Sequence, residues 1–196
     1  MKIRTKGERQ MDNNSIPFNM EFTFDKDLRE KPVDFEDMKC GVHHMIEQLE
    51  SVEDPDVEAK IYGEIGVYSR IIGELDDSER FLQKAINLHI LKENLSSVFI
   101  NQLRLAHTYQ WQKEFNKANK LFNELIKKVH DHSRYELYKD FLYQHYGKCK
   151  YDEGEFEAAY SLFQVALKIR KEKGDYSLVR STEASINRCK EILMLP

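Results

Sequence analysis

The sequence predicts an all-α fold, a right-handed α-α superhelix built from helical hairpins and preceded by an extended N-terminal segment. The first observation is that residues 56–195 contain no proline. Because a proline inside a helix costs about 3 kcal/mol, this absence favours one helix after another. The second observation is that small and large apolar residues recur along this stretch at a fixed period. A period of this length is typical of a stack of two-helix units.

The composition is that of an ordinary globular domain. The chain has 196 residues and a formal net charge of −4, with 41% hydrophobic and 33% charged residues. These values exclude a disordered chain, and the charge gives no reason to expect a nucleic-acid partner. No apolar run reaches the roughly 18 residues of a bilayer span, and no signal peptide is visible. Cys40, Cys149 and Cys189 are far apart in the sequence, so we expect free thiols in a cytoplasmic protein.

Helix start signals divide the chain into eight predicted helices. Asp34 and Asp54-Pro55 have the character of N-caps, and residues 76–79 and 133–136 match the capping box. The domain at 34–196 is therefore expected to contain helices over 34–51, 55–72, 76–93, 96–112, 115–130, 134–152, 156–173 and 177–194.

Internal repetition defines the unit. The small residues Gly66, Ala106 and Gly147 lie 40 and 41 positions apart. Each is followed nine residues later by an apolar residue and sixteen residues later by a large one: Leu75 and Leu82, Phe115 and Phe122, Phe156 and Phe163. We expect the small residue to allow close approach of the two helices, and the large residue to fill the space between neighbouring hairpins.

These positions resemble the tetratricopeptide repeat (TPR) family. The matching residues are Leu105-Ala106, Tyr109, Phe115, Ala118 and Phe122 in the middle copy, and Gly147, Gly154-Glu155-Phe156, Ala159, Phe163 and Ala166 in the third. The resemblance implies repeats at about 55–93, 96–130 and 134–173, with a capping helix at 177–194. The period exceeds the family's usual 34 or so, as in the similar repeats of bacterial peptide-sensing regulators and kinesin-light-chain-like scaffolds.

The resemblance implies a concave groove, lined by the first helix of each hairpin, that binds another protein or a peptide. Matching offsets place these residues in it: Arg70, Leu103, His107, Gln110, Trp111, Gln144, Lys148 and Tyr151. Aromatic side chains would anchor a ligand, and the polar ones would bond its backbone or a carboxylate. The alternative is that they form only a solvated inner wall. A chaperone-adaptor role is not supported, because Gly63, Val67, Phe141 and His145 stand where that clamp has Lys, Asn, Lys and Arg.

Residues 1–33 lie outside the repeats and carry a different pattern. The alternation of Ile16, Phe18, Met20, Phe22 and Phe24 with polar residues or Pro17 predicts a half-buried β-strand over 16–24. No second strand is evident, and a lone strand cannot satisfy its backbone. Three outcomes remain open: self-association of this segment in a homodimer, occupation of the chain's own groove, or a loosely ordered tail.

The first residues carry a further hint about the source. Lys6-Gly7-Glu8 can be encoded by a ribosome-binding sequence placed before Met11. We therefore expect a bacterial origin and an alternative start at Met11, with residues 1–10 untranslated in that case.

The sequence offers no catalytic, cofactor-binding or metal-binding residues. His43-His44 with Glu47, and His130-Asp131-His132, lack the spacing of a metal site, and no nucleophile or phosphate-loop motif is present. We therefore expect a non-catalytic scaffold that binds protein or peptide and requires no cofactor. The alternatives are a peptide-responsive bacterial regulatory sensor and, from another class, a metal-dependent hydrolase.

Overall fold

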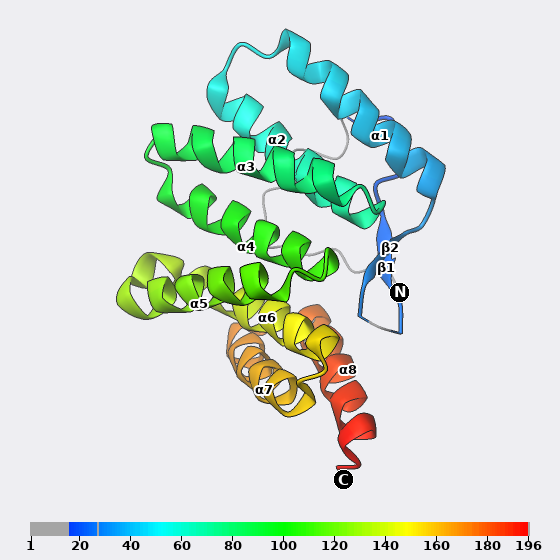
Figure 1. Cartoon of the computed structure of the whole chain (residues 1–196), viewed down its shortest axis with the longest axis vertical. Helices are drawn as coiled ribbons and strands as arrows, with labels where there is room; N and C mark the ends of the chain where they lie inside the picture. The colour runs from blue at the N-terminus through cyan, green and yellow to red at the C-terminus, as the bar shows by residue number, and fades with distance from the viewer. Residues whose placement is uncertain (1–15, 27, 196) are drawn as a thin grey trace. The chain divides into compact units, whose positions relative to one another are not determined.

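The structure is a computed structural model that describes residues 16–26 and 28–195. It confirms the all-α class: the described residues form eight sequential α-helices that pack as hairpins, after one short β-hairpin (Figure 1). The expectation about Met11 lies outside the described residues. The elements are β1 (Phe22–Phe24), β2 (Glu30–Pro32), α1 (Phe35–Gln48), η2 (Leu49–Ser51), α2 (Pro55–Ile71), α3 (Leu75–Leu91), α4 (Leu95–Trp111), α5 (Phe115–Asp131), η3 (Ser133–Tyr138), α6 (Lys139–Glu153), α7 (Phe156–Lys173) and α8 (Tyr176–Leu193).

Two of the predicted helix starts are confirmed by their caps. The Asp34 carboxylate accepts the Asp37 N–H at 3.0 Å, and the Asp54 carboxylate accepts the Asp56 N–H at 2.9 Å, with Pro55 as the first residue of α2. Each cap satisfies a backbone donor that the helix itself leaves unpaired.

The two predicted capping boxes are wrong. Helix α3 begins at Leu75 without a side-chain cap, and the Glu79 carboxylate accepts instead from Tyr109 at 3.1 Å and Gln112 at 3.0 Å, at the end of α4. Ser133 opens the 3₁₀ helix η3, which has no side-chain cap. At Glu79 contacts between helices take the carboxylate that the local pattern assigned to its own helix end.

The turns within and between hairpins repeat their backbone conformation. The turns that follow α2 and α6 contain Gly73 and Gly154 with φ of +89° and +86°, and Lys113 has φ of +61° at the equivalent position after α4. The left-handed conformation is free of steric strain only for glycine, so Lys113 holds a strained turn.

The small residues of the repeat face the large ones within the same hairpin. A Cβ added to Gly66 would lie 2.5 Å from Leu82 Cγ, and one added to Gly147 would lie 2.6 Å from the Phe163 ring. The predicted close approach of the two helices is therefore confirmed, but the large residue fills space within its own hairpin. The expectation that it fills the space between neighbouring hairpins is wrong.

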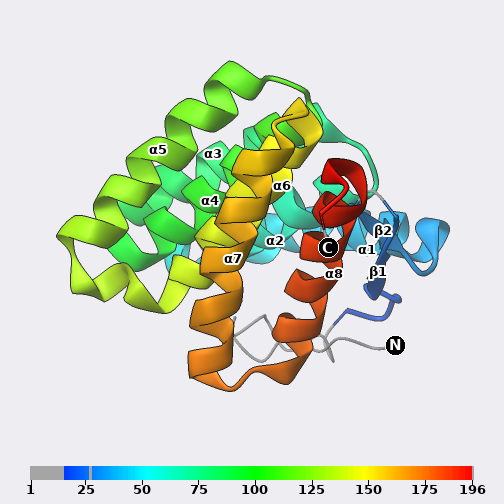
Figure 2. The same cartoon turned by 90° about the horizontal axis from the view of Figure 1, so that it is seen from below.

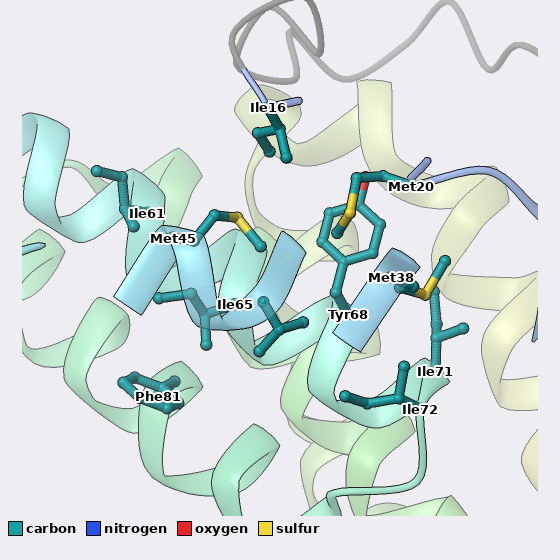
Figure 3. Close-up of a cluster of buried hydrophobic side chains, with 11 residues drawn as sticks. Ile16, Met20, Met38, Met45, Ile61, Ile65, Tyr68, Ile71, Ile72 and Phe81 are labelled. Atoms are coloured by element: carbon teal, nitrogen blue, oxygen red, sulfur yellow. The ribbon is translucent and has the colours of Figure 1, made fainter. Parts of the chain in front are cut away.

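The chain divides into two compact units, residues 1–112 and 113–196. The first holds the β-hairpin and α1–α4, and Figure 3 shows that its core includes side chains from the N-terminal segment. Ile16 and Met20 are buried with Met38 and Met45 of α1 and Tyr68 of α2. In the second unit α7 and α8 run side by side, joined by a short turn at Gly174 (Figure 2).

The N-terminal segment differs from the expected lone strand. Only residues 22–24 are extended in a ladder, and a second strand, β2, pairs with them in antiparallel register, Phe22 opposite Pro32. Strand β2 reads Glu-Lys-Pro and has no apolar alternation, so its pattern could not be recognised. The alternating residues Ile16 and Met20 precede the strand and pack onto the helices.

Candidate functional site

The residues predicted to line a groove fall on three helices. Arg70 lies on α2, four others lie on α4, and three lie on α6: Leu103, His107, Gln110 and Trp111, then Gln144, Lys148 and Tyr151. The first five belong to the first unit and the last three to the second.

The centre of the group in the first unit is a buried ion pair. Arg70 Nη1 donates to Glu30 Oε2 at 3.0 Å, and each side chain is only 6% exposed. Arg70 lies in the last turn of α2, and Glu30 begins β2. A hydrogen bond from a guanidinium to a carboxylate thus joins the β-hairpin to the helices. Hydrogen bonds between charged groups are stronger than those between neutral groups.

Trp111 lies beside this ion pair at the end of α4. The Arg70 guanidinium is 4.9 Å from its ring centroid, and that of Arg29 is 5.2 Å away. Both distances are within the range of cation–π attraction, which is strongest for tryptophan. The indole ring therefore contacts one cation from α2 and one from the hairpin.

His107 completes the arrangement one helical turn before Trp111. The Trp111 Nε1–H donates to His107 Nε2 at 3.2 Å, and the two rings meet edge to face. Because an indole nitrogen can only donate, His107 Nε2 is unprotonated in this arrangement. The same nitrogen lies 3.9 Å from the Glu30 carboxylate. We call Arg70, His107 and Trp111 the carboxylate receptor.

The structure brings Arg70, His107 and Trp111 close together, whereas the hairpin residues that contact them could not be predicted. Arg29 and Glu30 lie in a polar stretch that has no periodic pattern. A turn places them: the Arg29 N–H donates to the Asp25 carboxylate at 3.0 Å, and the Asp25 N–H donates to the Arg29 carbonyl at 2.9 Å. The aspartate at the end of the apolar alternation is the one local signal for that turn.

The predicted residues of the second unit are engaged by its last helix. Gln144 donates to Ser185 of α8 at 3.1 Å and accepts from Arg170 of α7 at 3.2 Å. Hydrogen bonds from Arg188 of α8 to Glu191 and to Tyr151 raise the pKa of Arg188. Lys148 is buried. Helix α8 therefore contacts the face of α6 on which a ligand was expected.

A buried polar network holds α6, α7 and α8 together. Arg170 donates through Nε to Asp140 at 3.0 Å and through Nη1 to Thr182 at 2.6 Å, and Lys173 also binds Asp140. Burial lowers the pKa of Arg170, and the adjacent Asp140 carboxylate opposes that shift. A buried network whose polar groups are hydrogen-bonded in this way fixes the three helices to one another.

Two features of residues 16–26 and 28–195 bear on metal and thiol chemistry. No group of three metal-ligating side chains is found there. Burial raises the pKa of the Cys149 thiol to about 12 and that of Cys189 to about 11, which removes the reactive thiolate at neutral pH. No helix in the described part combines the length and apolar character of a bilayer span.

The comparisons with known proteins bear on this architecture. No family model and no curated protein matches the chain. A solved structure does match, the crystal structure of BtubC (BKLC) from P. vanneervenii, with a TM-score of 0.54. The fold is a TPR-like helical array. The match covers 83% of this chain and 74% of BtubC at 17% sequence identity, a level at which the likeness concerns the fold alone.

Proposed function

We propose that this TPR-like chain is a non-catalytic binding module that holds an extended segment of another polypeptide on its carboxylate receptor. The observation that supports this proposal is the Glu30 carboxylate seated on Arg70, beside His107 and Trp111. An extended segment thus already occupies the receptor. That segment is the chain's own hairpin.

The chemistry of the receptor favours an acidic occupant. The Arg70 guanidinium is nearly excluded from water, and a buried charge without a partner is strongly destabilising. An anion that replaces Glu30 would again neutralise the charge of Arg70. The planar guanidinium matches the geometry of a carboxylate. Trp111 adds a flat aromatic surface, the kind of anchor on which binding energy concentrates at protein interfaces.

Polar contacts and limited apolar packing hold the hairpin on the helices. Among residues 21–26 and 28–33, Glu30 is the only buried residue, and Thr23, Phe24 and Lys31 are exposed. Phe22 packs only partly buried against the core, so the hairpin exposes less apolar surface on leaving the helices than a fully buried segment would. A segment from a partner with the same charged groups can take its place.

The test uses the full chain with the change Glu30→Ala and a synthetic peptide of residues 21–33. Trp111 is the only tryptophan, so its fluorescence reports the receptor without labelling. We expect saturable binding of the peptide and no binding by the Glu30→Ala/Arg70→Ala double variant. The unchanged chain should bind more weakly, because a tethered hairpin has an effective concentration of roughly millimolar. Absence of saturable binding by Glu30→Ala would contradict the proposed function.

A further inference from the structure

We infer that the carboxylate receptor recognises a basic residue followed directly by an acidic residue in the extended segment of a partner polypeptide. This inference rests on the proposed function and specifies what the partner must carry. In the structure the chain's own Arg29–Glu30 provides this pair: the guanidinium lies over Trp111 and the carboxylate binds Arg70.

The two positions of the pair have different partners, so the pair is read in order. Strand β2 begins at Glu30, and Arg29 belongs to the turn before it. The turn and the start of the strand thus bring two adjacent side chains to different groups, Arg29 to the ring of Trp111 and Glu30 to the end of the Arg70 side chain. Exchanging them would bring a second guanidinium to Arg70.

The electrostatics require both members of the pair. Arg29 and Arg70 both lie against Trp111, so two like charges approach the same ring. The Glu30 carboxylate, 3.0 Å from Arg70 Nη1, offsets this positive charge. A segment with only the acidic residue would make no cation–π contact with Trp111. A segment with only the basic residue would bring its positive charge close to that of Arg70, with no carboxylate to offset the repulsion.

A separate polypeptide fits the receptor better than a second copy of this chain. The residues before the hairpin are fixed within the first unit: Met20 is buried in its core, and the Asn19 N–H donates to Asp37 of α1 at 3.2 Å. The Val33 N–H also donates to the Glu21 carbonyl at 2.9 Å. Exchange of hairpins between copies would break this anchorage, whereas displacement of Arg29 and Glu30 by a partner leaves Met20 in place.

The experiment measures peptide binding to the full-length Glu30→Ala chain through Trp111 fluorescence, with the mass followed by light scattering. Four peptides of residues 21–33 are compared: the native one, one with the order of Arg29 and Glu30 exchanged, one with Glu30→Gln and one with Arg29→Gln. The exchanged peptide has the same composition and net charge as the native peptide. If Glu30→Ala lowers the helix content, the Glu30→Gln chain replaces it.

We expect the exchanged peptide to bind at least tenfold more weakly than the native peptide, and each Gln peptide to be weaker as well. Binding of the exchanged peptide within twofold of the native one would overturn the ordered pair while leaving the proposed function in place. Failure of every peptide, the native one included, would overturn the proposed function too. If the mass of the protein doubles when the Trp111 signal changes, the receptor binds a second copy of this chain. That result would overturn the inference that its ligand is a separate polypeptide.

Discussion

Arg70 and Glu30 are separated by 40 residues in the sequence, yet their side chains meet at 3.0 Å in the interior of the first unit. This contact joins the segment that precedes the helices to the last turn of α2. It also places a carboxylate on residues that the repeat pattern assigned to a ligand-binding face. The predictions below test this contact and the helical frame that supports it.

Glu30→Gln should loosen the hairpin while the helices stay folded. Loss of the carboxylate leaves Arg70 with a neutral partner, and the hairpin can move into water to avoid burying an unpaired charge. We expect about 1–3 kcal/mol less stabilisation of the docked hairpin, near the range for a hydrogen bond to a charged group. Emission from Trp111 should change, with unaltered far-UV circular dichroism.

The matched control for that variant is Glu53→Gln, the same chemical change at an exposed position between η2 and α2. Its Trp111 emission should equal that of the unchanged chain. Equal emission from Glu30→Gln and Glu53→Gln would show that the ion pair does not hold the hairpin.

Gly66→Ala should destabilise the α2–α3 hairpin. The new Cβ would overlap Leu82, which is fully buried, so the helices must separate or Leu82 must leave its rotamer. Such overpacking typically costs about 1–3 kcal/mol of unfolding free energy. Chemical denaturation measures it, and the added change Leu82→Val should recover part of the loss. Strict additivity of the two changes would argue against the contact.

Lys113→Gly should leave the unfolding free energy unchanged or raise it by up to about 1 kcal/mol, because glycine relieves the left-handed strain although it loses more entropy on folding. The adjacent change Gln112→Gly is the control, since Gln112 has φ of −68° and gains nothing from glycine. Thermal unfolding of both variants measures the difference in stability. A lower melting temperature for Lys113→Gly than for Gln112→Gly would contradict the strained turn.

His89 should make the first unit sensitive to mild acid. Burial on α3 lowers its pKa from the ordinary 6.5, although Asp56 acts in the opposite direction. The unfolded chain therefore binds a proton at a higher pH than the folded chain does. The unfolding free energy should be greatest above pH 6.5 and decrease as the pH falls below it, by at most about 1.4 kcal/mol per pH unit from this group.

Urea unfolding between pH 5 and pH 8 measures the effect of His89. His89→Gln should flatten the profile in this range, whereas His43→Gln, at an exposed position on α1, should not. A profile that keeps its slope in His89→Gln would assign the acid sensitivity to other groups.

Much of the helical frame could be predicted from the sequence, because local signals determine it. Asp34 and Asp54-Pro55 mark the starts of their helices because they cap them. Gly66 and Gly147 mark the repeat because each allows two helices to pack closely. The capping box at 76–79 failed where a longer-range contact took the side chain of Glu79. Local sequence patterns predict where a helix forms, whereas packing between helices determines which hydrogen bonds a polar side chain makes.

The candidate site could be predicted on one side only. Arg70, His107 and Trp111 follow from the repeat offsets, whereas Glu30 reaches them through a turn that no periodicity marks. Gln144 shows the reverse case: its offset suggested a ligand, but α8 covers it. The homodimer stays a prediction, with Ile16 and Met20 buried in their own chain, Phe18 and Phe22 partly buried, and Phe24 39% exposed.

The most direct test of the central claim is a charge-reversal cycle on the full chain, read by amide hydrogen exchange in residues 21–33. Glu30→Arg and Arg70→Glu should each release the hairpin, because each places two like charges together at the receptor. The double variant restores an opposite pair in the reverse order, and we predict that it recovers a large part of the protection. Protection in the double variant no better than in the weaker single variant would contradict a receptor that holds its occupant by this contact.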